Sequence, residues 1–367
     1  MGASTLLTLN AGSSSLKCAL YVDGERVASA SVGRIGTETK DHAAALEKAL
    51  AAMGAHGEIS VVGHRVVHGG ERLVAPVRID DDVLAELHRL APLAPDHLPV
   101  EIALIEAMHA RSKDTPQVAC FDTAFHATLP RVARLLPIPR RYQADGVRRY
   151  GFHGLSYQYI VGHLGAAAAG RVVMAHLGAG ASLCAAHHGK SVDTTMGFTA
   201  TGGIPMGTRT GDLDPGVLLY LMRNEDASAA ALDDLVNKRS GLLGVSASSA
   251  DMRDLLSREA SDPAAADAVA LFCYGVRKAV GAMAATLDGL DTLVFAGGIG
   301  ENAPAVRERV CRGLTHLRVT LDPTRNAASA DVVSADASAC KVRVVRTDEE
   351  AVIASETMAV LKGSPQP

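Results

Sequence analysis

The chain has 367 residues, of which 48% are hydrophobic and 21% charged, and its formal net charge is -4. This balance is typical of folded globular chains and argues against long disordered segments. The sequence has no long run of Lys and Arg, which argues against nucleic acid as a partner, because phosphate backbones are bound by clustered basic side chains. A chain of this length is expected to hold about two domains.

The cysteines and the first residues bear on where the protein works. The six cysteines are widely scattered and none has the C-x-x-C spacing of a zinc or thioredoxin-type site. Scattered thiols in a long chain are typical of reduced cytosolic proteins. The opening MGASTLLTLN lacks the basic and apolar regions of a signal peptide, and no apolar run is long enough to span a bilayer. We expect a soluble, cytoplasmic protein with no membrane partner.

The first elements are predicted to be strands joined by small-residue turns. LLTLN is followed by the turn AGSS and by SLKCALYVDGERVA, in which Asp23-Gly24 is typical of a hairpin. The stretch DDDVLAELHRLAPLA, residues 80–94, has acidic residues at its start and apolar spacing of three and four, which predicts a helix. QVACFDTAF then predicts a strand that ends at Asp122.

The second half of the chain repeats the pattern of the first. RVVMAHL, GAGA and SLCAAHHGKSVDTT, residues 171–195, give the same order of apolar run, small-residue turn, Ser-Leu strand and Gly-containing turn. Internal repetition of this kind predicts two similar halves, each of which begins with a hairpin.

The remaining elements complete an alternating pattern. Residues 262–287 predict a long amphipathic helix that starts at Asp262-Pro263. The strand DTLVFA and a turn GGIGEN follow it. Alternating strands and helices indicate an α/β protein, in which ligands bind at the carboxyl ends of strands.

Three small-residue stretches follow apolar strands and suit phosphate binding, because their backbone N–H groups can reach a ligand without side-chain obstruction. They are residues 12–15, 178–180 and 297–300. Each alone is also consistent with an ordinary turn. The glycine spacing of a P-loop occurs at residues 165–172, but Arg171 and Val172 replace the required Lys and Ser or Thr. We therefore expect any nucleotide to be held by paired hairpin turns.

Four basic residues are candidates for binding an anion. Lys17 follows the serine turn, and Arg65, in GHRVVHGGE, lies at a strand end where its guanidinium fits a carboxylate or phosphate. Arg209 lies in MGTRTGDLDP and His153 in RRYGFHG. A solvent-facing lysine, a loop salt bridge and a structural histidine are the alternatives for Lys17, Arg209 and His153.

Taken together, these stretches resemble the acetate kinase family, within the superfamily of acetate and sugar kinases, heat-shock ATPases and actin. The resemblance runs nearly end to end and rests on LNAGSSSLK, GHRVVHGGE, FDTAFH, RRYGFHG, HLGAGAS, GKSVDTTMGFT, MGTRTGDLDP, SGLLGVS, GGIGEN and TDEE. It implies a duplicated ribonuclease H-like fold, with an N-terminal domain of residues 1–125 plus 350–367 and a nucleotide-binding, dimerising domain of residues 126–349. It also implies a homodimer that phosphorylates acetate or propionate with Mg-ATP, reversibly, giving an acyl phosphate and ADP.

The resemblance implies a role for each matching position. The metal, Mg²⁺ with Mn²⁺ as an alternative, would be held by Asn10 and Glu349. The carboxylate would be bound by Arg65, Val67, His97 and Phe152. Catalysis would use Asp122, His153 and Arg209. ATP would be bound by Ser13, Ser15, Lys17, His176, Leu177, Gly178, Ala179, Gly180, Asp251, Met252, Arg253, Gly298, Ile299, Gly300, Glu301 and Asn302.

Phosphoryl transfer depends on positioning and on neutralising spread negative charge. Because a carboxylate nucleophile is already ionised at pH 7, we expect Asp122 to orient the metal or an arginine rather than to remove a proton.

The sequence departs from the family at four positions. Asp96 falls where the family has an apolar residue against the substrate's methyl group, and Ala200 falls where it has a pocket proline. A buried acid is costly unless paired or solvated, so either Asp96 turns away or the pocket takes a larger or more polar acid. Ala179 replaces the usual Asn of the second phosphate turn, and Asp348 makes TDEE of the usual TNEE, which adds a charge beside Glu349. A non-catalytic ATP-binding protein on the same fold is the alternative to an enzyme.

Overall fold

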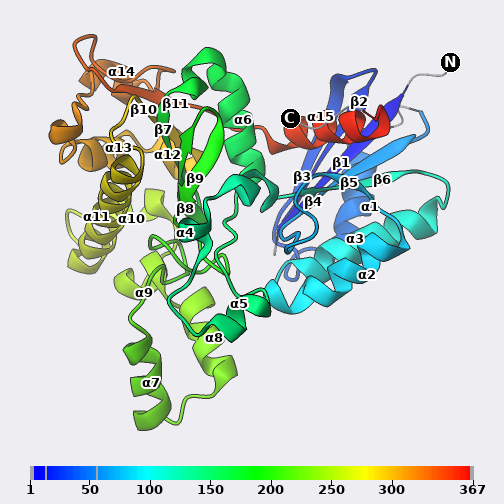
Figure 1. Ribbon diagram of the computed structural model, residues 1–367, viewed down its shortest axis with the longest axis horizontal. Helices are drawn as coiled ribbons and strands as arrows, with labels where there is room; N and C mark the ends of the chain where they lie inside the picture. Colours follow the sequence, from blue (N-terminus) through cyan, green and yellow to red (C-terminus); the bar gives the residue numbers. More distant parts are fainter. Residues whose placement is uncertain (1–3, 13–14, 55–56, 364–367) are drawn as a thin grey trace. The chain divides into compact units, whose positions relative to one another are not determined.

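The computed structural model, drawn in Figure 1, describes residues 4–12, 15–54 and 57–363. It divides into two compact units. The N-terminal unit comprises residues 1–127, 154–159 and 348–367, and the C-terminal unit comprises residues 128–153 and 160–347. The predicted second domain contained residues 126–127, 154–159 and 348–349, but these residues group with the N-terminal unit. That these units are independent domains stays a prediction.

The N-terminal unit is built on one sheet with the strand order β3-β2-β1-β4-β6-β5. Its first strands form antiparallel hairpins, and β1, β4 and β6 run parallel. The elements are β1 Thr5–Gly12, β2 Ser15–Val22, β3 Glu25–Val32, α1 His42–Met53, β4 Val61–Val66, β5 Val77–Arg78, α2 Asp81–Leu90, η1 Ala91–Leu93, α3 Leu98–Arg111, β6 Gln117–Phe121 and α15 Glu349–Leu361.

Alternation along β1 explains how this sheet is buried on both faces. Leu7 and Leu9 pack with apolar residues of α1 and α3, whereas Leu6 packs with Tyr21 and with Ala354 of α15. Because successive side chains of a strand point to opposite faces, a strand buried on both sides is apolar at nearly every position. The chain end therefore covers one face of the first sheet, and helices from the first third cover the other.

The C-terminal unit repeats this plan. Its sheet has the order β11-β10-β7-β8-β9, in which β7, β8 and β9 are antiparallel neighbours and β7, β10 and β11 are parallel. Read from β9, this order matches β3-β2-β1-β4-β6 strand for strand. The repeat predicted from the sequence is therefore confirmed as a repeat of topology.

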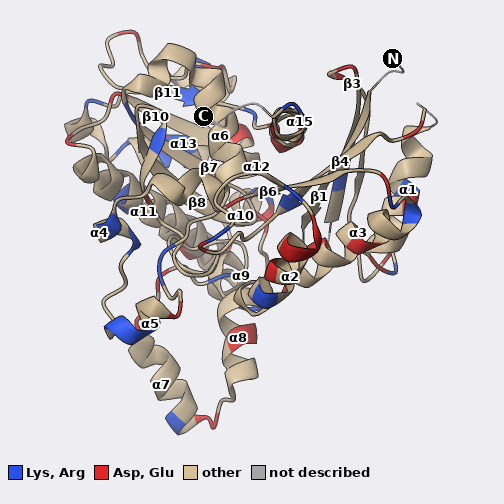
Figure 2. Ribbon diagram, turned by 45° about the vertical axis from the view of Figure 1, so that its right-hand side comes forward, with Lys and Arg blue, Asp and Glu red and all other residues tan. Residues whose placement is uncertain are grey.

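The elements of the C-terminal unit are α4 Arg131–Arg134, α5 Arg140–Ala144, η3 Gly165–Ala169, β7 Arg171–Leu177, β8 Ala181–His187, β9 Lys190–Thr194, α7 Pro215–Asn224, α8 Ala229–Lys238, α9 Gly241–Ser246, α10 Met252–Arg258, α11 Pro263–Thr286, β10 Thr292–Ala296, α12 Gly297–Asn302, α13 Pro304–Cys311, η4 Thr315–Leu317, α14 Pro323–Ala327 and β11 Lys341–Val344. Two short elements join the units: η2 Ala124–Thr128 and α6 Gly154–Leu164. Within the units, helices such as α2 carry both acidic and basic residues (Figure 2).

The predicted long helix is α11, and Asp262 caps it by accepting from the backbone N–H groups of Ala264 and Ala265. By length and composition α11 is apolar enough to cross a membrane, a weak signal that the core helices of globular domains also give. Its buried residues include Val269, Phe272 and Val276, which pack inside the unit.

One local prediction was wrong. GGIGEN was expected to be a turn, but residues 297–302 form the short helix α12. Gly297 makes the junction with β10 at a φ of 74°, and a Cβ at this position would lie 2.7 Å from the carbonyl oxygen of Leu177. Only glycine allows β7 and the start of α12 to approach so closely.

Candidate active site

The predicted site residues fall into two groups, one in each unit. The N-terminal unit carries Asn10, Ser15, Lys17, Arg65, Val67, His97, Asp122 and Glu349. The C-terminal unit carries the remaining members: Phe152, His153, His176 to Gly180, Arg209, Asp251 to Arg253 and Gly298 to Asn302. Ser13 lies outside the described residues.

Arg65 and Asp122 form the centre of the first group. They lie at or just beyond the carboxyl ends of the parallel strands β4 and β6, which pair in register and bring the two side chains together. Asp122 Oδ2 accepts hydrogen bonds from Arg65 Nη2 at 2.6 Å and from Nε at 3.1 Å. Burial raises the pKa of Asp122, and the neighbouring guanidinium opposes that rise. Asp122 thus holds an arginine, as expected from the sequence.

The guanidinium of Arg65 is fixed on its other side as well. Nη1 donates to the carbonyl of Ala11 at 2.8 Å and approaches Glu101 Oε1 at 3.4 Å. Burial alone would lower the pKa of Arg65, but the carboxylates of Asp122 and Glu101 outweigh it and raise this pKa. Among the described residues, these contacts account for four of the five N–H groups, which leaves one N–H on Nη2 to meet a ligand.

The predicted metal ligands also lie together. Asn10 Nδ2 donates to Glu349 Oε2 at 2.9 Å and to Glu350 Oε1 at 3.0 Å. Ser156 Oγ donates to Glu349 Oε1 at 2.6 Å. Asn10 and Glu349 come from opposite ends of the chain. They meet because α15 packs against β1. These side chains carry amide and carboxylate oxygens, the ligand type that Mg²⁺ prefers, although the Asn10 atom that faces the glutamates here is its amide nitrogen.

The other predicted residues of this unit differ in exposure. Lys17 is exposed on β2 and is paired in register with Asn10, so both side chains lie on the same face of the hairpin. Val67 is buried and His97 is half-buried just before α3. Asp96 is exposed, which supports the expectation that this acid turns toward solvent.

In the C-terminal unit, a histidine and an arginine converge on the second phosphate turn. A Cβ built on Gly180 would lie 3.5 Å from both His153 Nε2 and Arg209 Nη1. His153 Nδ1 lies 2.9 Å from the buried Ser182 Oγ, and its ring stacks on that of His176 with centroids 4.4 Å apart. These contacts orient two cationic or hydrogen-bonding side chains toward the turn between β7 and β8.

The adenosine-end residues line a cavity of about 530 Å³ within the same unit. This volume lies in the range of pockets that bury small-molecule ligands. The lining includes half of the sixteen positions predicted to bind ATP: Gly178, Ala179, Asp251, Met252, Arg253, Gly298, Ile299 and Asn302. The structure therefore brings the second and third small-residue stretches together, as expected for a nucleotide site, although Leu177 is fully buried and offers only its backbone.

The wall formed by α12 is supported from behind by a buried arginine that the sequence analysis missed. Arg307 has 0% exposure and donates to the carbonyls of Gly300 and Glu301 at 2.8 and 3.0 Å. It also bonds Asn326, at 2.8 Å through the side chain. Nothing in the local pattern of α13 distinguishes this arginine from a surface one.

Sequence reasoning also missed Glu101, Glu350, Ser156 and Ser182. Glu350 was signalled by its place beside Glu349 in TDEE. Glu101 was not, because an acidic residue in the first turn of a helix is ordinarily explained by the helix dipole.

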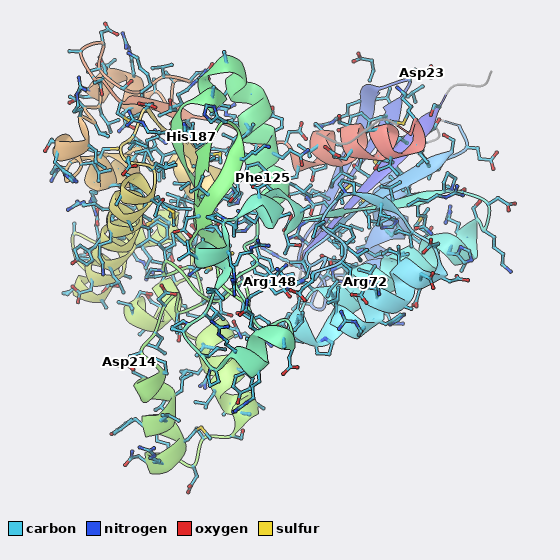
Figure 3. The ribbon with its side chains drawn as sticks, in the orientation of Figure 1. Asp23, Arg72, Phe125, Arg148, His187 and Asp214 are labelled. Carbon is cyan, nitrogen blue, oxygen red and sulfur yellow. The ribbon has the colours of Figure 1, made fainter. Side chains whose placement is uncertain are left out.

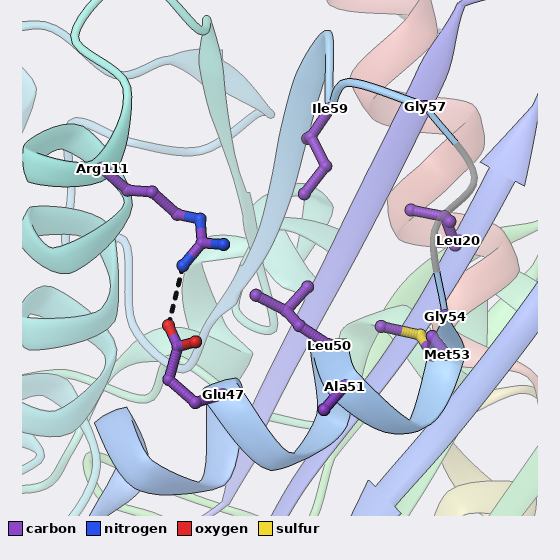
Figure 4. Close-up of a pocket in the computed structure, with 9 residues that line it drawn as sticks. All are labelled: Leu20, Glu47, Leu50, Ala51, Met53, Gly54, Gly57, Ile59 and Arg111. Atoms are coloured by element: carbon purple, nitrogen blue, oxygen red, sulfur yellow. Dashed lines mark hydrogen bonds and ion pairs between the residues drawn. The ribbon is translucent and has the colours of Figure 1, made fainter.

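A second cavity, of about 350 Å³, lies in the N-terminal unit beneath the end of α1 (Figure 4). Its walls combine apolar side chains such as Leu50 and Ile59 with two ionic groups, Glu47 and Arg111, which pair with each other at 2.8 Å. It contains none of the predicted site residues.

Comparisons with known proteins agree with this geometry. The sequence profile of the Acetokinase family matches residues 33–355. The chain is 46% identical to the acetate kinase of Methylocella silvestris, over 97% of this chain and 98% of that one. It is 41% identical to the propionate kinase of Citrobacter rodentium, over 97% and 96%.

Solved structures show the same likeness. The acetate kinase of Porphyromonas gingivalis superposes with a TM-score of 0.87 at 37% identity, over 98% of this chain and 100% of that one. The propionate kinase of Francisella tularensis superposes with a TM-score of 0.89 at 33% identity, over 97% and 100%. With the repeated strand order, these superpositions confirm the expected duplicated α/β fold. By sequence and by structure, the chain belongs to the acetokinase family.

Proposed function

We propose that the protein transfers the γ-phosphoryl group of ATP to a short-chain carboxylate, reversibly, to give an acyl phosphate and ADP. The observation that carries this proposal is the guanidinium of Arg65, whose side chain is 13% exposed and is held by Asp122, Ala11 and Glu101 while one N–H remains for a ligand oxygen. A buried, immobilised arginine is well suited to orient a carboxylate, because its donors do not have to be ordered on binding.

The proposed reaction is an in-line displacement at phosphorus. The substrate's carboxylate oxygen attacks, the bond to the β-phosphate oxygen breaks, and ADP leaves with the bonding electrons. Because the nucleophile is already an anion, no side chain has to take a proton. Asp122 acts in this scheme by holding Arg65, and His153 and Arg209 neutralise the charge that develops on the transferred group.

The nucleotide would lie in the C-terminal unit. Its adenosine would occupy the cavity of about 530 Å³, and its phosphates would meet the backbone N–H groups of residues 178–180. Lys17 and the first small-residue turn would supply further contacts to the phosphates.

Magnesium would be held by Asn10 and Glu349, with Mn²⁺ as an alternative. Asp122 Oδ1 is buried and makes no hydrogen bond of standard geometry with the described residues, which supports the proposal of a cation or its water near this oxygen. Those residues contain no cluster of three or more His, Cys, Asp or Glu side chains that could hold an ion alone, which suits Mg²⁺ bound mainly by phosphates and water. When bound, the ion neutralises the phosphate charge and orients the transferred group.

The preferred acid is a separate question. Asp96 is exposed, which favours an unaltered alkyl pocket. Ala200 is smaller than the family's proline, and its carbonyl accepts a bond from Arg209 at 3.2 Å. The test is kcat/KM for acetate, propionate, butyrate, glycolate and lactate. A clear preference for acetate or propionate supports the proposal, and a preference for the hydroxy acids would favour a larger or more polar substrate.

The class of reaction is tested by trapping the acyl phosphate with hydroxylamine in the presence of Mg-ATP. Formation of acetohydroxamate is the expected result. ATP binding without hydroxamate from any short acid would favour a non-catalytic ATP-binding protein.

We also propose a homodimer built through the C-terminal unit. No residue of α7 is buried, and this helix exposes Val217, Leu219, Tyr220 and Met222. Contiguous exposed apolar residues commonly mark a protein interface. A cytoplasmic location remains a prediction from composition.

A further inference from the structure

Glu101 is a buried carboxylate that no role in the proposed reaction yet explains. It lies in the first turn of α3 and is 2% exposed. Its two oxygens have different partners: Oε1 faces Arg65 Nη1 at 3.4 Å, and Oε2 accepts from the backbone N–H of Val67 at 2.9 Å. One side chain therefore contacts both Arg65 and Val67.

Glu86 is a second buried glutamate that pairs with arginines, but those arginines are not proposed site residues. Glu86 in α2 is 5% exposed and accepts from Arg89 at 2.6 Å and from Arg72 at 3.4 Å. The side chains of Arg72 (labelled in Figure 3) and Arg89 are 73% and 65% exposed, so both partners of Glu86 lie at the surface. The partners of Glu101, in contrast, are residues proposed to contact substrate.

The two contacts of Glu101 constrain different ends of a bound carboxylic acid. Arg65 would receive the carboxylate, and Val67 would bound the alkyl group. Asp122 fixes the opposite edge of the Arg65 guanidinium. Without Glu101, this group would be held by Asp122 and by the carbonyl of Ala11. The N–H of Val67 would also lose its buried acceptor, which costs stability unless the backbone moves.

We infer that Glu101 is a positioning residue that fixes the spacing between Arg65 and Val67 and thereby sets the chain length of the acid that fits. This inference rests on the proposed function. It differs from the role proposed for Asp122, which holds Arg65 but has no hydrogen bond to Val67.

The test compares Glu101→Gln with the matched control Glu86→Gln. A glutamine has one acceptor oxygen, so it can satisfy Val67 or Arg65 but not both as the glutamate does. We expect Glu101→Gln to raise the KM for acetate about tenfold, the effect of losing one hydrogen bond to a charged group. The KM for ATP should stay within about twofold, and the ratio of kcat/KM for propionate to that for acetate should change at least about threefold. Glu86→Gln should leave all three quantities unchanged.

ADP binding, measured by calorimetry, reports whether each variant is folded, and Glu101→Asp provides a second, charge-retaining variant. The inference is overturned if Glu101→Gln binds ADP normally and keeps the wild-type KM for acetate and the wild-type chain-length preference. It is also overturned if neither Glu101 variant binds ADP, because the residue is then needed for folding alone. A wild-type protein that forms no acyl phosphate would instead overturn the proposed function.

Discussion

Asp122 receives both hydrogen bonds from Arg65 on a single oxygen, Oδ2, at 2.6 and 3.1 Å. This geometry supports the proposal that Asp122 orients Arg65. A general base is not needed in the proposed reaction, because the carboxylate substrate has no proton to give.

Replacement of Asp122 by Asn tests that assignment. The amide keeps the shape but loses the charge, so Arg65 should be held less firmly, and we expect kcat/KM to fall about 10- to 100-fold. The pH profile of kcat between pH 6 and 9 should keep its shape, because no proton transfer is lost. Near-wild-type kcat would show that the charge is not essential, and loss of one limb of the profile would indicate a base.

Glu101 should make stability depend on pH. Burial raises the pKa of Glu101 to about 7, above its ordinary value. The folded state therefore keeps a proton that the unfolded chain releases, so the contribution of Glu101 is complete below the unfolded pKa and is lost as pH rises through about 7. The test compares the free energy of unfolding of Glu101→Gln with that of wild type. Measured relative to wild type, the variant should gain about 3 kcal/mol of stability between pH 4 and pH 8. An equal difference at both values would show that Glu101 titrates normally.

Ala179 tests the second phosphate turn. It lines the cavity and is exposed, so a side chain at this position can reach a ligand. Its carbonyl accepts from the N–H of Gly207 at 3.0 Å, which fixes the backbone of the turn. Ala179→Asn adds the amide that the family usually has, and we expect the KM for ATP to fall about two- to fivefold, as one added polar hydrogen bond allows. Unchanged kinetics would mean that this position does not contribute to phosphate binding.

The extra charge of Asp348 is neutralised by Arg26. Arg26 Nη2 lies 2.6 Å from both carboxylate oxygens, and Asp348 also caps α15 by accepting from the N–H of Ala351. This pair places a compensating cation beside the charge that Asp348 adds next to Glu349.

Arg26→Met should therefore leave an uncompensated carboxylate beside the proposed metal ligands. We expect a two- to fivefold rise in the KM for Mg-ATP, about 0.5–1 kcal/mol. Asp348→Asn keeps the cap and should be nearly neutral, and the double variant should recover the wild-type value. If the double variant is as impaired as Arg26→Met, the effect does not come from the charge of Asp348.

The apolar face of α7 predicts the oligomeric state. Leu219→Asp with Tyr220→Asp places two charges at positions that are 47% and 60% exposed. We expect the mass measured by light scattering to fall from that of a dimer to that of a monomer, because buried, unpaired charges oppose association. The control is Val74→Asp, an exposed apolar position of the other unit, which should leave the mass unchanged.

The sequence by itself determined the elements and most of the chemistry. Apolar runs separated by small-residue turns, with Asp23-Gly24, predicted the first hairpins, and the same pattern at residues 171–195 predicted the duplicated sheet. Local signals sufficed here because strand burial and turn geometry depend on neighbouring residues. GGIGEN was misjudged because its glycines suit both a turn and the close approach of Gly297 to Leu177, which belongs to a distant strand.

Only the tertiary structure decided which charges share an environment. Arg65 meets Glu101 across 36 residues and Asp122 across 57, and Asn10 meets Glu349 across 339. Charge pairing of this kind leaves no periodic trace in the sequence, because it arises where β4, β6, α3 and α15 pack together. The same packing shows that Glu101 lies beside Arg65 and Val67, whereas Glu86, a buried glutamate of α2, pairs with the exposed Arg72 and Arg89.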